Sequence, residues 1–138
     1  IKFDTVLSPW AISLETTDPV KLEVLRLAKD TRTVAISRPV NRIEGVKLTA
    51  EQYHNLVKYG RKEMLVNGLN YRDTLDEVMN SDLYLESPTD DARVLILNSI
   101  TKKFDEAAKA WLMSTDEELY GKIQSKKEKK INKLIGDK

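Results

Sequence analysis

The sequence of 138 residues contains no cysteine, one histidine, five glycines and four prolines. The absence of cysteine excludes disulfides, thiolate catalysis and cysteine-based zinc sites. No run of about 18 apolar residues is present, so the sequence predicts no transmembrane helix, and its start shows no signal-peptide pattern. The chain begins with Ile1 instead of methionine, which indicates a processed product or a piece of a longer protein.

Motifs for catalysis are equally scarce. The glycines are scattered, so no phosphate-binding loop is formed, and neither a Gly-x-Ser-x-Gly elbow nor a His-Glu-x-x-His motif occurs. The single histidine, His54, shares a polar helix face with Lys58 and Arg61, which is typical of a surface histidine. Asp90 and Asp91 form the best carboxylate pair, but the dipole of a predicted helix already favours acids there. We therefore predict no enzyme and no catalytic, metal-binding or cofactor-binding residue; a small enzyme with carboxylate chemistry is the alternative.

Charge is abundant and unevenly placed. Charged residues make up 33% of the chain and hydrophobic residues 41%, which suits amphipathic helices with solvated outer faces. Residues 1–121 contain 16 basic and 20 acidic side chains, whereas residues 122–138 contain seven lysines and two acids. The overall charge of +1 therefore conceals a basic C-terminal segment.

Capping signals predict two helices in the first half of the chain. Asp18 is a good N-cap and Pro19 is favoured at the first helical position, which predicts a helix over residues 19–30. Thr49 with Gln52 three residues later forms a capping box, and this is the clearest helix start in the sequence.

Further signals follow along the chain. Gly60 falls on the apolar stripe of the helix after Thr49, so another helix can approach closely there, and Asn67-Gly68 supplies a stop. Asn70 can cap a short helix, after which residues 83–85, Leu-Tyr-Leu, are expected to enter the core.

The longest predicted helix, about residues 88–113, opens with Ser87-Pro88 and should be central. Its apolar stripe consists of Leu97, Ile100, Phe104, Ala107, Ala108 and Trp111. A last helix over residues 116–138 is preceded by a capping box that starts at Ser114 or Thr115. Its apolar stripe is thin and interrupted at Lys127, so we expect it to dock weakly or to project from the body.

The remaining segments are expected to be extended. Residues 1–17 read as an arm anchored by Trp10. Residues 31–47 could form one short edge strand or a strap across the helices, and the strap is favoured because no second strand is available. The predicted fold class is all-α, with four to five helices and an extended N-terminal arm and strap wrapped around a long central helix. The predicted organisation is an arm, a short helix 19–30 and a strap in residues 1–48, a helical core in residues 49–115, and a lysine-rich helix in residues 116–138.

The basic end of the chain supplies the candidate binding residues. Lysines can neutralise phosphates on nucleic acid or anionic lipid. The alternative interpretation is a solvated helix end, where cations also suit the helix dipole. The candidate polyanion contacts are Lys122, Lys126, Lys127, Lys129, Lys130 and Lys133. The candidate interface residues for another protein chain are Ile131, Leu134 and Ile135.

The order of motifs over residues 8–113 resembles the C-terminal regions of large bacteriophage proteins, both internal virion or ejection-type proteins and long polyvalent proteins. The matching elements are Asp18-Pro19-Val20, Arg26-Leu27, Gly45-Val46-Lys47-Leu48-Thr49 with Tyr53, and Ser81 with Tyr84. The resemblance brings no catalytic residues. It implies a phage-encoded setting, in the virion or the host cytoplasm, and a helical assembly role.

The residues and the resemblance together predict a non-catalytic helical assembly module of a large virion-associated phage protein. Its expected partners are other protein chains, either virion proteins or copies of itself, and no small-molecule substrate is evident. The alternative is a module that contacts nucleic acid or an anionic membrane through its lysine-rich C-terminal helix.

Overall fold

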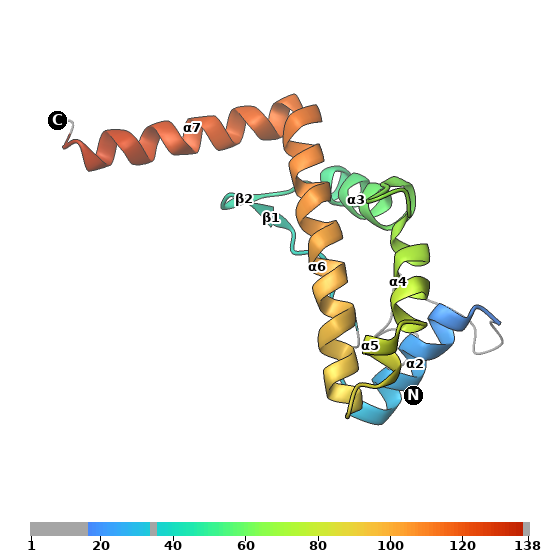
Figure 1. Ribbon diagram of the computed structural model, residues 1–138. Helices are drawn as coiled ribbons and strands as arrows, with labels where there is room; N and C mark the ends of the chain where they lie inside the picture. Colours follow the sequence, from blue (N-terminus) through green and yellow to red (C-terminus); the bar gives the residue numbers. More distant parts are fainter. Residues whose placement is uncertain (1–16, 34–35, 137–138) are drawn as a thin grey trace.

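The structure is a computed structural model that describes residues 17–33 and 36–136. It confirms an all-α fold built around one long helix, with a sheet of only two short strands in the described residues (Figure 1). In chain order the elements are α2 (Pro19–Thr31), β1 (Arg42–Ile43), β2 (Val46–Lys47), α3 (Ala50–Lys58), the π-helical turn η1 (Tyr59–Glu63), α4 (Tyr71–Met79), α5 (Asp82–Leu85), α6 (Asp90–Thr115) and α7 (Glu117–Leu134). The predicted arm and its anchor Trp10 lie outside the described residues.

Helix α6 is the central element, as predicted, and it packs against α2, α3, η1, α4 and α7. Its fully buried residues are Leu97, Thr101, Phe104, Ala108 and Leu112. The predicted stripe was partly wrong, because Ile100, Ala107 and Trp111 are only partly buried at its margin. Thr101 takes a core position because its hydroxyl donates to the Leu97 carbonyl and lies 2.7 Å from the Tyr71 hydroxyl, so its polar group is satisfied.

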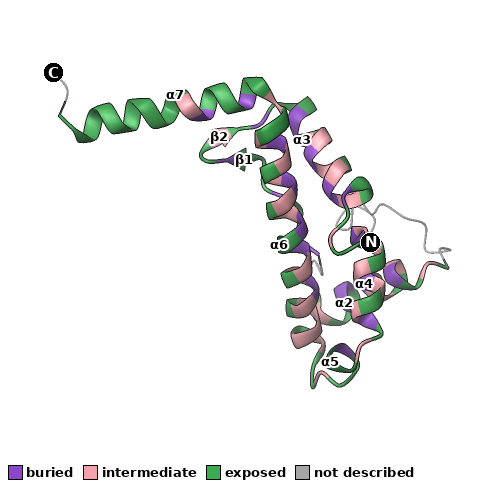
Figure 2. Cartoon of the chain, turned by 45° about the horizontal axis from the view of Figure 1, so that its top comes forward, coloured by how far each residue is buried: buried purple, intermediate pink, exposed green. Residues whose placement is uncertain are grey.

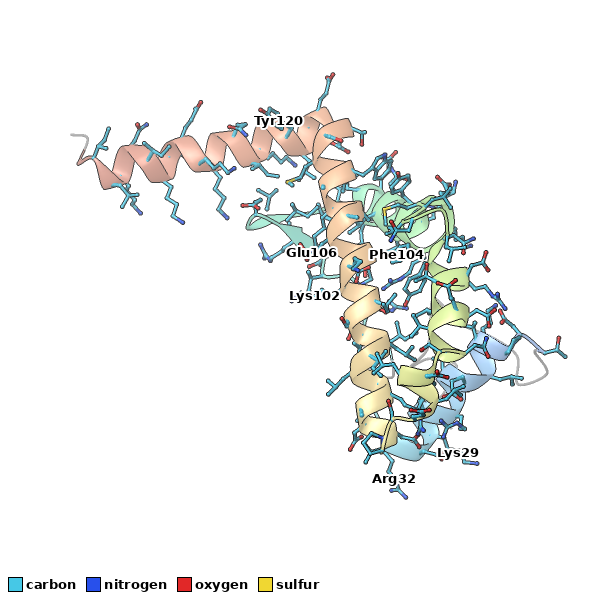
Figure 3. All side chains as sticks on the ribbon, in the orientation of Figure 1. Lys29, Arg32, Lys102, Phe104, Glu106 and Tyr120 are labelled. Atoms are coloured by element: carbon cyan, nitrogen blue, oxygen red, sulfur yellow. The ribbon has the colours of Figure 1, made fainter. Side chains whose placement is uncertain are left out.

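Figure 3 places Phe104 on the side of α6 that faces α4, and Lys102 and Glu106 on the opposite side. Phe104 is fully buried and meets the ring of Tyr71 edge to face, with centroids 5.4 Å apart. Trp111 is partly exposed and stacks on Tyr59 at 3.9 Å. The core therefore lies between α6 and the helices α2, α3 and α4.

The predicted helix starts are confirmed at Asp18, at Thr49 and at Asn70, whose side chain accepts from the Asp73 N–H at the start of α4. The Asp18 side chain caps α2 by accepting from the Val20 N–H, and Pro19 occupies the first turn. At α3 the capping box is complete, since Thr49 accepts from the Gln52 backbone and the Gln52 side chain accepts from the Thr49 backbone. Helices α2 and α3 then bury one face against the body.

Gly60 has the role that its position predicted. A Cβ atom at Gly60 would lie 3.0 Å from the Cβ of Ala108, so the glycine allows η1 to approach α6 closely. The helical segment ends at Glu63, before the predicted stop. Asn67 and Gly68, both with positive φ, instead form the turn of a single bridge between Val66 and Leu69.

Two other boundaries differ from the predictions. Helix α6 begins at Asp90 with Thr89 as N-cap, because the Ser87 hydroxyl donates to the Leu83 carbonyl and is used in the preceding turn. The N-cap of α7 is Asp116, since the hydroxyls of Ser114 and Thr115 donate back to Trp111 within α6.

The segment that follows α4 was also expected to be more buried than it is. Of residues 83–85 only Tyr84 enters the core, while Leu83 and Leu85 are exposed. These residues form the single turn α5, whose one inward position is taken by Tyr84.

The prediction of an extended strap holds for only part of residues 36–47. Ser37–Asn41 carry no regular structure, but β1 and β2 pair as a small antiparallel hairpin. Its two-residue turn consists of Glu44 and Gly45, both with positive φ, as in the tight turns that match strand twist. The second strand thus comes from the same segment, which the prediction of an unpaired strap missed.

Helix α7 projects from the body at the end of α6 opposite α5, and the hairpin lies beneath its first half (Figure 1). Figure 2 shows buried residues only near its start. The prediction of a weakly docked, projecting last helix is therefore confirmed for Glu117–Leu134.

Candidate functional site

The projecting helix α7 is held to the body at its first two turns. Asp116 accepts from the Leu119 N–H at 2.9 Å and from the Gln52 side chain at 3.2 Å. Gln52 is itself the buried partner in the capping box of α3, so one side chain joins the starts of two helices. Leu119 and Ile123 are buried in the same core cluster as α6. The direction of α7 is thus set by packing and by a chain of capping hydrogen bonds.

The hairpin supplies a second support one turn farther along. The Lys126 Nζ donates a hydrogen bond of 2.8 Å to the Gly45 carbonyl oxygen. A Cβ atom at Gly45 would lie 2.7 Å from that Nζ, so a larger residue would push the lysine end aside, and the positive φ of Gly45 favours glycine in this turn. After Lys126 every described residue of α7 is exposed.

The exposed part of α7 has one apolar side. Ile131, Leu134 and Ile135 follow at spacings of three and four, so they share one side of the helix, and Tyr120 lies eleven residues before Ile131 on that side. We call these four residues the apolar edge; their exposed fractions are 54% for Tyr120, 55% for Ile131, 78% for Leu134 and 72% for Ile135. The three predicted interface residues are therefore brought together in space.

The predicted lysines divide into two groups. Lys122, Lys126, Lys129 and Lys133 follow at spacings of four, three and four, which places them along one side of α7; we call them the lysine stripe. Lys130 continues the row of Leu119 and Ile123, and Lys127 interrupts the apolar edge. At 100° per residue the lysine stripe lies roughly 160° around the helix from the apolar edge.

The positive charge of α7 is largely uncompensated. Lys122 pairs with Glu118 at 3.4 Å on the exposed surface. In the part of the chain that the structure describes, the other five predicted lysines form no ion pair with a carboxylate. Helix α7 therefore presents two distinct surfaces, one cationic and one apolar.

Sequence reasoning did not identify the hairpin residues Arg42 and Lys47. Both are exposed, and Arg42 lies directly across from Lys47 in the strand register. The available signal was the Glu44-Gly45 pair between two short stretches that each combine an apolar and a basic residue, which fits a two-residue hairpin turn.

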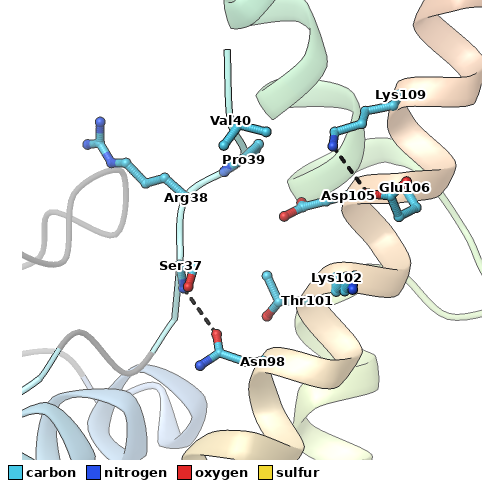
Figure 4. A pocket seen from close by; sticks show the side chains of 10 residues that line it. All are labelled: Ser37, Arg38, Pro39, Val40, Asn98, Thr101, Lys102, Asp105, Glu106 and Lys109. Carbon is cyan, nitrogen blue, oxygen red and sulfur yellow. Dashed lines mark hydrogen bonds and ion pairs between the residues drawn. The ribbon is translucent and has the colours of Figure 1, made fainter. Parts of the chain in front are cut away.

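An open groove of about 290 Å³ separates Ser37–Val40 from α6 (Figure 4). Asn98 bridges its walls by accepting from the Ser37 N–H at 3.2 Å, and Lys109 pairs with Glu106 at 3.2 Å on its rim. Its charged groups have mixed signs and partly neutralise one another. The groove therefore offers no convergent set of groups for one ligand.

A largely buried ion pair between Arg61 and Asp105 has a structural role. Arg61, in η1, lies 3.0 Å from Asp105, stacks over the Tyr71 ring at 4.5 Å and donates to the Ser37 carbonyl. Burial raises the pKa of Asp105 and also the pKa of Tyr71. The cluster fastens η1 and residue 37 to α6.

The histidine and the aspartate considered above as possible catalytic or metal-binding residues are at the surface. His54 is exposed on α3. Asp90 is engaged by Arg26 and Arg93, and the hydrogen bond from Arg26 lowers the pKa of this carboxyl. Across residues 17–33 and 36–136, no group of three histidine, cysteine or acidic side chains could hold a metal ion.

Comparison of the chain with protein-family models, with curated proteins and with solved structures finds no match in any of the three. Among the helices of the described residues, none combines the length and the apolarity needed to cross a bilayer.

Proposed function

We propose that this chain is a non-catalytic helical assembly module that joins another protein chain through the apolar edge of α7. The observation that supports this most directly is the exposure of Ile131, Leu134 and Ile135. They lie at the end of α7, where the helix no longer packs against the rest of the protein. From Lys126 to Leu134 the helix extends about 12 Å beyond its last support.

The exposed apolar end of α7 favours a protein partner. Short isolated helices are marginal in water, and helices in proteins gain most of their stability from packing of an apolar face. Here that face has no partner within the described chain. A helix or groove of a second chain would bury the apolar edge and stabilise the projecting turns.

The proposed setting is a large phage protein. It is supported by the resemblance of residues 8–113 to C-terminal regions of such proteins, carried by Asp18-Pro19-Val20 and by the segment from Gly45 to Tyr53. In that setting the module would work in the virion or the host cytoplasm, with virion proteins or further copies of itself as partners.

Self-association is the first form of this function to test. The variant Ile131→Gln/Leu134→Gln/Ile135→Gln removes the apolar end while keeping residues that tolerate a helix. The matched control, Leu83→Gln/Leu85→Gln/Leu95→Gln, changes three equally exposed apolar residues on the body. Sedimentation velocity over a concentration series should show the wild type and the control associating and the α7 variant remaining monomeric.

Two outcomes would contradict the self-association form of the proposal. One is a wild type that stays monomeric at every concentration; the other is equal loss of association in both variants, which would indicate nonspecific contacts. Far-UV circular dichroism should show the same helix content in the body of each variant.

A second candidate function is contact with a polyanion, a nucleic acid or an anionic membrane, through the lysines of α7. The alignment of four of these lysines in one stripe favours it. Because the lysine stripe and the apolar edge are on different sides of α7, the two functions do not compete for the same surface.

A further inference from the structure

Two cationic side chains from distant parts of the sequence meet at one carbonyl group. The Gly45 oxygen accepts from the Lys126 Nζ at 2.8 Å and from an Arg42 guanidinium nitrogen at 3.3 Å. A neutral carbonyl supplies only a partial negative charge, so it holds the two cations close together without cancelling their charge. The fold therefore concentrates positive charge where α7 crosses the hairpin.

A third cation belongs to the same place. Arg42 and Lys47 are directly opposed in the hairpin, and such pairs project to the same face of the two strands. Ile43 is buried on the other face, as the alternation of a strand requires. Arg42 and Lys47 are thus neighbours on the outer face of the hairpin.

The lysine stripe extends this cationic area along α7. Lys126 belongs to the stripe and marks the side of α7 that faces the hairpin. Lys122 precedes it by one turn, and Lys129 and Lys133 follow within two turns on that side. Arg42, Lys47 and the lysine stripe together form what we call the basic corner.

Acidic neighbours do not neutralise the basic corner. Among the described residues, only Lys122 of this group pairs with a carboxylate, on Glu118. In the same described part of the chain Glu44, in the hairpin turn, forms no ion pair with these cations, and Glu128 lies well over 90° around α7 from the centre of the stripe. The corner thus keeps most of its positive charge although the whole chain is nearly neutral.

We propose that the basic corner binds the phosphate backbone of duplex nucleic acid without reading its sequence. The stripe runs for about 16 Å along α7, and a duplex carries one charge per roughly 1.7 Å of its axis, so each lysine meets phosphates. Lysine is a flexible point charge that neutralises phosphate without the fixed fork that reads guanine. This inference rests on the second candidate function and adds the hairpin to it.

The geometry favours a duplex over the other polyanions. A helix that lies on an anionic membrane also carries its lysines opposite its apolar side. Here, however, Arg42 and Lys47 lie on the lysine side of α7, so insertion of the apolar edge would leave both on the far side of the helix from the lipids. Proteins that bind single strands stack bases on aromatic rings. The basic corner has none, since Tyr120 belongs to the apolar edge.

Fluorescence anisotropy with a short labelled DNA duplex of mixed sequence tests the proposal. Binding of the wild type should weaken steeply between about 50 and 200 mM salt. Arg42→Gln/Lys47→Gln should weaken binding about ten-fold and reduce the slope of log affinity against log salt by about two. The matched control Lys29→Gln/Arg32→Gln makes the same charge change at the opposite end of the molecule from α7 and should leave both values unchanged (Figure 3).

The outcomes separate this inference from the function on which it rests. A wild type that binds the duplex, with Arg42→Gln/Lys47→Gln binding equally well, would overturn the role of the hairpin alone. A wild type that fails to bind at about 50 mM salt would overturn polyanion binding altogether. Preference for single-stranded DNA, or binding only to phosphatidylglycerol vesicles, would overturn the assignment to a duplex. If melting shows that the double variant disturbs the hairpin, Lys47→Gln alone should lower the slope by about one.

Discussion

The guanidinium of Arg61 lies 3.0 Å from the carboxylate of Asp105, with side chains only 8% and 13% exposed, at the junction of η1 and α6. Arg61 also contacts Tyr71 of α4 and the Ser37 carbonyl, so this cluster connects four segments of the chain. A buried pair of this kind contributes little net stability by itself, but removal of one partner leaves an uncompensated charge in the core.

Arg61→Met should therefore lower the free energy of unfolding by about 3–5 kcal/mol at neutral pH. Burial already raises the pKa of Asp105 above that of the unfolded chain, and loss of Arg61 removes a group that opposes this rise. In the variant the Asp105 carboxyl therefore holds its proton more tightly in the folded than in the unfolded state. The free energy of unfolding of Arg61→Met then falls as pH rises through the raised pKa of Asp105. Denaturant titrations should show a larger defect at neutral than at acidic pH.

The control is the double variant Arg61→Met/Asp105→Leu, which leaves no buried charge. It should recover most of the lost stability and show no pH dependence of the difference from wild type in this range. An Arg61→Met variant with the same defect at both pH values would mean that Asp105 is not the group left unpaired.

The capping chain that joins α3 to α7 gives a second prediction. Thr49→Ala removes one hydrogen bond at the start of α3 and should destabilise the protein by about 0.5–2 kcal/mol. Gln52→Ala should cost more, because Gln52 is buried and serves both the Thr49 backbone and Asp116. Thermal melts of the two variants compare these costs, and a smaller effect for Gln52→Ala would contradict the bridging role.

The packing of Phe104 gives a third prediction. Phe104→Ala should destabilise the protein by about 3–5 kcal/mol, because the ring is fully buried against Tyr71. Trp111→Ala should cost less, since the indole is only partly buried. Chemical denaturation of both variants gives the comparison, and a near-wild-type Phe104→Ala would argue against α6 as the centre of the core.

Features that depend on a few neighbouring residues were predictable from the sequence. The cap at Thr49 needs only Gln52 three residues later, and the start at Asp18 needs only Pro19. The fold class followed from the spacing of apolar residues, and the projecting α7 from the thinness of its stripe. All of these are properties of one segment.

Features that depend on partners elsewhere in the chain were not predictable in this way. Thr101 is a core residue because Tyr71, thirty residues earlier, lies against its hydroxyl. The hairpin strands of two residues each are too short to show a strand period. Of the basic corner, the sequence predicted the lysines of α7 but not the hairpin residues, because no local pattern connects Arg42 with Lys126.

The way α7 joins the body gives the last prediction, because only its first turns belong to the core. A last helix that docks weakly or projects, as the sequence predicts, implies that residues 122–138 can be removed without harm to the body. Ile123 is buried at 3% exposure, however, so a harmless deletion has to begin after it. Removal of residues 125–138 should leave the melting temperature nearly unchanged, since it takes away one hydrogen bond to the hairpin and no buried apolar group. Ile123→Ala in the full chain should cost about 2–5 kcal/mol.

The deletion of residues 125–138 should abolish both self-association and duplex binding, because it removes most of the apolar edge and three lysines of the stripe. A deleted chain that unfolds would show that the projecting turns stabilise the body; one that still binds DNA with the wild-type salt dependence would place the polyanion site elsewhere.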